Sequence, residues 1–423
     1  MRALLSGVFR PVQYSGRKRT PGGPNTRLHR GSNAMQFIDL EIQQARIRTS
    51  IDARIKKVLD HGKYIMGPEV KELEELFCSF TGSRNCITCA SGTDALLMPL
   101  MAWGVKPGDA VFVPPFTFFA TAEEPALLGA TPVFVDVDPV TFNMRPDLLK
   151  KAIEAIQKQD DAIYPLPKAA LEHQLTPRVV IPVDLFGQAA DYEAILPIAH
   201  EHNLMVLEDA AQAFGGSRYG KKACALGCHA AATSFFPAKP LGCYGDGGAV
   251  FTDDDDLTEL LRSIRVHGKG DDKYDNVRLG LNGRLDTLQA AVLLAKMEIF
   301  PAEIEARQKI AGWYARYLAG IAGVTVPAVA SSCVSAWAQY CILLPEDCRE
   351  PVAAHLKQQG IPTNIYYPKP QHSLAVFADL GYAPEAMPTA LHASRHILAL
   401  PFHPYLDEAI VRQVADAIKE AME

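Results

Sequence analysis

Seven strand-like apolar runs, most of them separated by helical patterns, limit the folds open to this chain. The runs lie at 85–90, 110–114, 132–136, 179–184, 204–208, 231–236 and 248–252; helical patterns lie at 40–61, 69–80, 93–103, 119–128, 146–157, 191–202 and 256–265. Strands that alternate with helices predict an α/β fold with a mostly parallel sheet covered on both faces. Ligands of such sheets bind at the carboxyl ends of the strands. We therefore expect the chemistry in the segments that follow these runs.

The rest of the chain predicts a second, smaller unit. A long helical pattern covers 285–320, followed by strand-like runs at 337–344 and near 363–367 and by helical patterns at 350–359 and 406–422. This mixture predicts a large domain over 35–300 and a small C-terminal α+β domain over 301–423. Residues 159–177 contain three prolines and mixed polarity, which predicts an inserted loop.

Residues 1–34 differ in composition from the rest. They hold seven Lys and Arg residues and no Asp or Glu. An organellar transit peptide has this composition, but a disordered or non-native extension before a natural Met35 is the favoured interpretation.

Overall charge and cysteine usage favour an ordinary intracellular protein. The net charge of −6 and a pI near 6.1 argue against nucleic acid as a partner. Nine irregularly spaced cysteines in 423 residues do not resemble a secreted disulfide framework, which favours a reducing cytoplasm. No apolar run is long enough to span a bilayer, so no membrane association is expected.

Three polar groups stand where strands are expected to end. Lys239 follows the run that ends at Phe236, Asp209 ends the run before it, and Ser91-Gly92-Thr93-Asp94 follows the run at 85–90. A lysine can form a Schiff base with the aldehyde of pyridoxal 5′-phosphate (PLP), and a carboxylate can keep the pyridine nitrogen protonated. A turn that opens a helix offers backbone N–H groups to a phosphate. These parts together predict a PLP enzyme.

Six motifs in order resemble those of the DegT/DnrJ/EryC1/StrS family of nucleotide-sugar aminotransferases. They are Ser91-Gly92-Thr93-Asp94-Ala95-Leu96, 114–122 (PPFTFFATA), Glu208-Asp209-Ala210-Ala211-Gln212, 234–239 (SFFPAK), Gly245-Asp246-Gly247-Gly248 and 282–291 (NGRLDTLQAA). The resemblance runs from about Phe37 to the end of the chain. It implies a PLP-dependent aminotransferase of fold type I that works as a homodimer with shared active sites.

The resemblance also implies roles for individual residues. Lys239 and Asp209 match the catalytic pair; an extended segment directs Glu208 to the opposite face. The other residues that match cofactor contacts are Gly92, Thr93, Phe118, Gln212, Ser234 and, from the partner chain, Asn282. No metal is expected, because Cys224, Cys228 and His229 lack a second Cys/His pair at ligand spacing.

Further segments narrow the expected substrate. Those around Phe37, Tyr64 and Lys239 resemble the family members that move an amino group from glutamate to the 3-keto carbon of UDP-2-acetamido-2-deoxy-3-oxo-glucuronate in bacterial O-antigen and related polysaccharide pathways. Arg284, Tyr366 and Tyr367 match substrate contacts, although position 366 is often His in that subgroup. A 4-keto-6-deoxy nucleotide sugar as the substrate, or a non-aminating or regulatory role, is the alternative.

Overall fold

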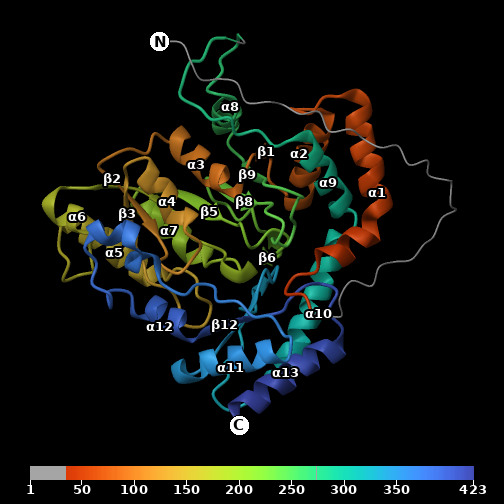
Figure 1. Ribbon diagram of the computed structural model, residues 1–423. Helices are drawn as coiled ribbons and strands as arrows, with labels where there is room; N and C mark the ends of the chain where they lie inside the picture. The colour runs from red at the N-terminus through yellow and green to blue at the C-terminus, as the bar shows by residue number, and fades with distance from the viewer. Residues whose placement is uncertain (1–34, 273) are drawn as a thin grey trace, which may run out of the picture. The chain divides into compact units, whose positions relative to one another are not determined.

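A seven-stranded sheet in the order β1–β9–β8–β5–β4–β2–β3 forms the framework of the protein (Figure 1). The computed structural model describes residues 35–272 and 274–423, so the interpretation of residues 1–34 lies outside the described residues. Strand β9 runs antiparallel to β1 and β8, and the remaining pairs in the sheet are parallel. The strands are β1 (Asn85–Cys89), β2 (Asp109–Val113), β3 (Thr131–Phe134), β4 (Thr176–Val180), β5 (Met205–Asp209), β8 (Ala230–Ser234) and β9 (Gly248–Thr252). The predicted α/β class is confirmed.

Helices flank this sheet and link its strands. They are α1 (Leu40–His61), α2 (Pro68–Thr81), α3 (Gly92–Ala102), α4 (Ala120–Leu127), α5 (Pro146–Lys158), α6 (Lys168–Glu172), α7 (Tyr192–Glu201), α8 (Asp255–Ile264), α9 (Thr287–Met297) and α10 (Phe300–Leu318). Polar caps define several of their starts. The Asp39 side chain accepts a hydrogen bond from Ile42 N at the start of α1, and Ser91 does the same for Asp94 N in α3. Such caps satisfy backbone N–H groups that the first helical turn leaves free.

Burial of both sheet faces explains why the central strands read as continuous apolar runs. All five residues of β2 and of β8 are buried. Helix α5 presents a single apolar stripe, in which Leu149, Ile153 and Ile156 are fully buried. This contrast between two-sided strands and one-sided helices is typical of a parallel sheet covered on both faces.

The C-terminal part builds a separate apolar cluster. Helix α13 (Glu408–Met422) packs against α10, and α11 (Glu346–Gln358) packs against α13, away from the large sheet (Figure 1). They cover a two-stranded antiparallel sheet of β11 (Tyr340–Leu343) and β12 (Ile397–Leu400), which α12 (Pro388–His396) precedes. A small three-stranded sheet of β10 (Cys333–Val334), β6 (Ser217–Arg218) and β7 (Lys221–Lys222) joins this part to the larger one. The division of the chain at residue 300 stays a prediction.

Two expectations about elements are wrong. The helical pattern at 285–320 is two helices, because Pro301 lacks the backbone N–H that would continue the helix from α9 and instead lies in the first turn of α10. The described residues 363–367 form no strand; Asn364 makes only an isolated bridge to Ala399.

The inserted segment 159–177 is packed rather than purely a loop. It contains α6 and the first residues of β4. The buried Tyr164 hydroxyl accepts a hydrogen bond of 2.9 Å from the backbone N–H of Asp136. This contact fastens the insertion to the body of the protein.

Candidate active site

Lys239 and Asp209 come together at the carboxyl edge of two neighbouring strands. Asp209 is the last residue of β5, and Lys239 lies five residues after the end of β8, its hydrogen-bonded neighbour. The turn that presents Lys239 closes with a 2.9 Å hydrogen bond from its backbone N–H to the Phe236 carbonyl. A Cβ at Gly242 would stand 2.6 Å from that same carbonyl oxygen, so the turn requires glycine there.

The charges of these two side chains act on each other. Burial lowers the pKa of the Lys239 amine, and the negative charge of Asp209 opposes that change. Burial likewise raises the pKa of the Asp209 carboxyl, and the Thr121 hydroxyl, the Ala211 N–H and the Lys239 charge act in the lowering direction. A buried lysine whose neutral form is favoured is a better nucleophile and proton carrier.

Hydrogen bonds fix the Asp209 carboxylate. The Thr121 hydroxyl donates to Oδ2 at 2.9 Å, and the Ala211 N–H donates to Oδ1 at 3.2 Å. The Thr117 hydroxyl lies 3.2 Å from that of Thr121. Thr121 lies in the motif at 114–122, but nothing in the sequence indicated that its hydroxyl would contact Asp209.

Gln212 links the Asp209 region to the two tyrosines. Its Oε1 accepts from the backbone N–H of Phe186 at 2.9 Å, and its Nε2 donates to the Tyr367 hydroxyl at 3.2 Å. The neighbouring Tyr366 hydroxyl accepts from Asn364 Nδ2 at 3.0 Å. The structure therefore places Gln212 and Tyr367 together, and Tyr366 beside them.

The start of α3 lies directly against the end of β8. A Cβ at Gly92 would stand 2.6 Å from Ser234 Cβ and 2.9 Å from its Oγ, so this contact requires glycine. Thr93 is exposed in the first turn of the helix. Backbone N–H groups of Gly92 and Thr93 and the Ser234 hydroxyl thus gather at a helix N-terminus, an arrangement that suits a phosphate.

Phe118 presents an exposed ring at the same edge, and Gln371 holds the loop behind it. The Phe118 side chain is 55% exposed. The buried Gln371 donates from Nε2 to the carbonyl oxygens of Phe118 (2.8 Å) and Thr117 (3.3 Å), and its N–H donates to the Pro115 carbonyl (2.7 Å). Sequence reasoning missed Gln371, since nothing local relates a residue 253 positions away to this loop.

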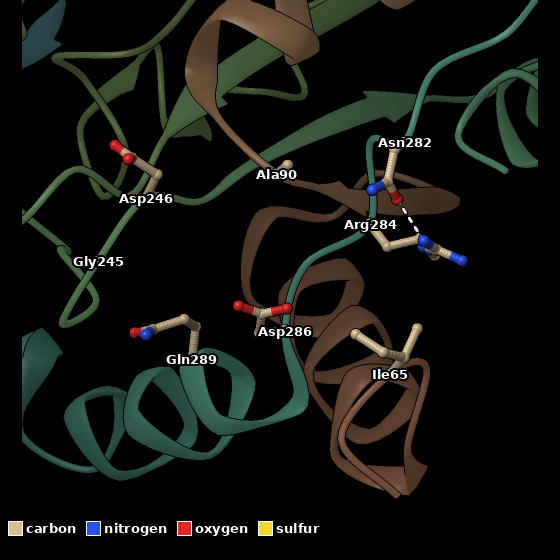
Figure 2. Close-up of a pocket in the computed structure, with 8 residues that line it drawn as sticks. All are labelled: Ile65, Ala90, Gly245, Asp246, Asn282, Arg284, Asp286 and Gln289. Atoms are coloured by element: carbon tan, nitrogen blue, oxygen red, sulfur yellow. Dashed lines mark hydrogen bonds between the residues drawn. The ribbon is translucent and has the colours of Figure 1, made fainter. Parts of the chain in front are cut away.

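Asn282 and Arg284 lie together in a cavity of about 380 Å³ (Figure 2). Arg284 donates a hydrogen bond to Asn282, while its own Nε is buried and has no partner within residues 35–272 and 274–423. The cavity lining is Ile65, Ala90, Gly245, Asp246, Asn282, Arg284, Asp286 and Gln289. This lining contains neither Lys239 nor Asp209, so within one chain these two residues are not part of the cavity.

The residues at the strand edge fit PLP. A buried carboxylate suits a pyridinium nitrogen, an amine of lowered pKa suits an aldehyde, and the glycine-lined start of α3 suits the phosphate.

The described part of the chain holds no cluster of three or more His, Cys, Asp or Glu residues suited to a metal. Its helices also include none that is long and apolar enough to cross a bilayer.

Comparison with known proteins gives a consistent picture. The model of the "DegT/DnrJ/EryC1/StrS aminotransferase family" matches residues 45–419. A Pseudomonas aeruginosa UDP-2-acetamido-2-deoxy-3-oxo-D-glucuronate aminotransferase is 47% identical over 91% of this chain and 99% of its own. A "pleiotropic regulatory protein" of Geobacillus stearothermophilus is 41% identical over 91% and 97%.

Solved structures agree with these relatives. A DegT DnrJ EryC1 StrS aminotransferase from Brucella abortus superposes with a TM-score of 0.84 at 48% identity, covering 91% of this chain and 99% of that one. NtdA from Bacillus subtilis, solved with bound cofactor PMP, superposes with a TM-score of 0.75 at 26% identity, covering 91% and 83%.

Proposed function

The chain belongs to the DegT/DnrJ/EryC1/StrS aminotransferase family and is a PLP-dependent transaminase, and from this premise we propose its substrates. It transfers the amino group of glutamate to the 3-keto carbon of UDP-2-acetamido-2-deoxy-3-oxo-glucuronate, in the cytoplasm, for a bacterial surface polysaccharide such as an O-antigen. The observation that carries this proposal is the 47% identity to the P. aeruginosa aminotransferase over 99% of its length.

Lys239 and Asp209 carry the reaction. PLP, when bound, supplies an electron sink for the bond changes at the amino-bearing carbon. The Nζ of Lys239 anchors the cofactor and moves the proton, a role that its lowered pKa and its place next to Asp209 support. The carboxylate of Asp209 holds a proton on the ring nitrogen. Its two hydrogen-bond donors keep it oriented and act against the rise in its pKa that burial causes.

The remaining cofactor contacts follow from the edge geometry. The N–H groups of Gly92 and Thr93 and the Ser234 hydroxyl would hold the phosphate. The exposed ring of Phe118 would offer an aromatic face to the pyridine ring. Gln212, held by Phe186 N–H and Tyr367, contacts the hydroxyl side of the ring.

A second copy of the chain completes each site. Ile65 is 49% exposed in the cavity beside Asn282 and Arg284, and Leu279, 88% exposed, lies in an adjoining hollow that Arg284 also lines. Large apolar side chains in such places are typical of a surface that another protein covers. In the homodimer, Asn282 reaches the phosphate of the partner's cofactor, and Arg284 meets the acid group of the sugar.

Tyr366 and Tyr367 bind the sugar from the same chain as Lys239. The support for this is the hydrogen bond that connects the Tyr367 hydroxyl to Gln212.

The regulatory relative from G. stearothermophilus keeps a second function open, in which the fold binds a ligand without turnover. The pairing of Lys239 with Asp209 favours the enzyme.

A substrate comparison tests this proposal. Purified protein with PLP and glutamate is offered the UDP-linked 3-keto uronate and, separately, a dTDP-4-keto-6-deoxy sugar, with Lys239→Ala as control. Mass spectrometry follows the aminated sugar, and a coupled assay follows 2-oxoglutarate. We expect the higher kcat/KM with the uronate. Amination of the 4-keto sugar alone contradicts the substrate, and PLP binding without any amination favours the ligand-binding alternative.

A further inference from the structure

Two fully buried carboxyl groups, Asp184 and Glu208, lie behind Asp209. Both side chains are 0% exposed. Glu208 precedes Asp209 on β5, and neighbouring side chains of a strand point to opposite faces. Asp184 follows the end of β4, and its backbone N–H donates to the Asp209 carbonyl at 3.0 Å. Neither carboxyl belongs to the reaction described above.

In each carboxyl, one oxygen accepts hydrogen bonds from the surrounding protein. Asp184 Oδ1 accepts from the backbone N–H of Ala190 at 2.9 Å and from the Tyr192 hydroxyl at 2.8 Å. Glu208 Oε1 accepts from the backbone N–H of Cys224 at 2.8 Å. Asp184 therefore has two donors to stabilise a negative charge, and Glu208 has one.

The other oxygen of each carboxyl has no donor among the described residues. These are Asp184 Oδ2 and Glu208 Oε2. The parallel bridge between Val183 and Asp209 places Asp184 and Glu208 on the same face of the sheet, and burial and the charge of Asp184 raise the pKa of the Glu208 carboxyl. Two carboxylate anions in contact inside a protein repel each other and have lost their hydration. The surrounding titratable groups are Tyr192, Cys224, Cys228 and Asp209, none of which supplies a positive charge.

We propose that Glu208 and Asp184 share one proton, donated by Glu208 Oε2 to Asp184 Oδ2, and that this pair holds the end of β4 against β5 behind the Asp209 carboxylate. The proton gives each orphaned oxygen a partner and leaves the pair with a single negative charge. Glu208 carries the proton because Asp184 already accepts two other hydrogen bonds. Its negative charge is therefore more stable than that of Glu208.

The pair acts on the site through the backbone. The Asp209 N–H donates to the Pro182 carbonyl at 2.9 Å, and the segment continues to Phe186, whose N–H holds Gln212. Asp184 and Glu208 are thus positioning residues, since they touch neither cofactor nor substrate. The proposal depends on the fold and not on the sugar, so it stands or fails separately from the proposed function.

Infrared spectroscopy of the protein without cofactor tests the shared proton. A protonated carboxyl has a carbonyl band that a carboxylate lacks and that shifts in D₂O. We expect the wild-type protein at pH 7 to show such a band that Glu208→Gln lacks. Asp184→Asn should lose it too, because the new amide donates to an ionised Glu208. As a matched control, Glu124→Gln removes another buried carboxyl, whose pKa burial raises to about 8; it should lose only the contribution of Glu124 and keep the band that the pair variants lack. An unchanged spectrum in both pair variants overturns the proposal.

Denaturant unfolding gives the second readout. The folded protein keeps a proton that the unfolded chain releases near the ordinary carboxyl pKa, so rising pH destabilises wild type relative to Glu208→Gln. The ratio of their unfolding constants should change about tenfold per pH unit while the proton is held. Glu208→Gln should match wild type in PLP affinity, and Glu208→Ala, which cannot donate, should bind PLP more weakly. A ratio that does not depend on pH, or equal PLP binding by the Ala variant, contradicts the proposal.

Discussion

Thr121→Val removes the hydroxyl that holds the Asp209 carboxylate and leaves the side-chain shape almost unchanged. The lost bond is 2.9 Å long, buried, and ends on an ionisable acceptor. A hydrogen bond to a charged group contributes about 1.5–3 kcal/mol. Since about 1.4 kcal/mol corresponds to one pKa unit, the pKa of Asp209 should rise by about one to two units.

The expected loss of stability in Thr121→Val depends on pH. The Thr121 hydroxyl lowers the pKa of Asp209, so its contribution is largest where the carboxyl is ionised and falls as the pH drops through the folded-state pKa. Unfolding of the cofactor-free protein by urea between pH 5 and pH 8 measures this. We expect a loss of about 1.5–3 kcal/mol at pH 8 that shrinks at pH 5.

Thr117→Val is the matched control for this variant. Its hydroxyl contacts Thr121 at 3.2 Å but makes no direct bond to Asp209, so it should have a smaller and less pH-dependent effect. Equal losses for both variants, or a Thr121→Val loss below about 0.5 kcal/mol at pH 8, would refute the conclusion that the Thr121 hydroxyl stabilises the Asp209 carboxylate.

Four further predictions concern the proposed site. Lys239→Ala should abolish transamination and the absorbance of lysine-bound PLP, and full turnover by this variant contradicts its role. Asp209→Asn should fold yet lose several orders of magnitude in kcat; a loss below about tenfold, or about 1.4 kcal/mol, assigns the task to another residue. Mixed dimers of Lys239→Ala and Asn282→Ala should regain activity, because one site then carries no lesion; flat activity after proven subunit exchange argues against shared sites. Gln371→Leu should weaken PLP binding and broaden the fluorescence of the bound cofactor, since the Phe118 loop loses two carbonyl contacts. Unchanged PLP affinity would show that these contacts do not support cofactor binding.

The central sheet was predictable because its signal is local. Buried parallel strands are short apolar runs, and each was placed within a few residues of β1–β5, β8 and β9. Strand β12 and helix α12 were not predicted, since Ile397–Leu400 follows the helix directly without a turn residue to mark the boundary. The break before α10 did have a local signal in Pro301, which the length of the pattern at 285–320 concealed.

The location of the candidate site residues was predictable where it depends on strand ends. The rule that ligands bind at the carboxyl edge of a parallel sheet predicted that Lys239, Asp209 and Gly92 would lie at one edge, as they do. Thr121 and Gln371 were not assigned roles because their contacts join segments far apart in the chain. The pairing of Asp184 with Glu208 likewise depends on the packing of two strands, which no spacing in the sequence reports.

The reversed direction of β9 restricts the length of the loop that precedes it. Because β9 runs against β8, its first residue, Gly248, lies opposite Ser234, the last residue of β8. Residues 235–247, which contain Lys239, therefore form a connection with both ends anchored at one rim of the sheet, and their contour length limits how far the amine can travel. An inserted or deleted residue in this stretch would displace the nucleophile directly, whereas the insertion at 159–177, placed before β4, leaves this connection unchanged. A change of length between β8 and β9 should therefore disturb the position of Lys239, whereas a change at the opposite rim should not.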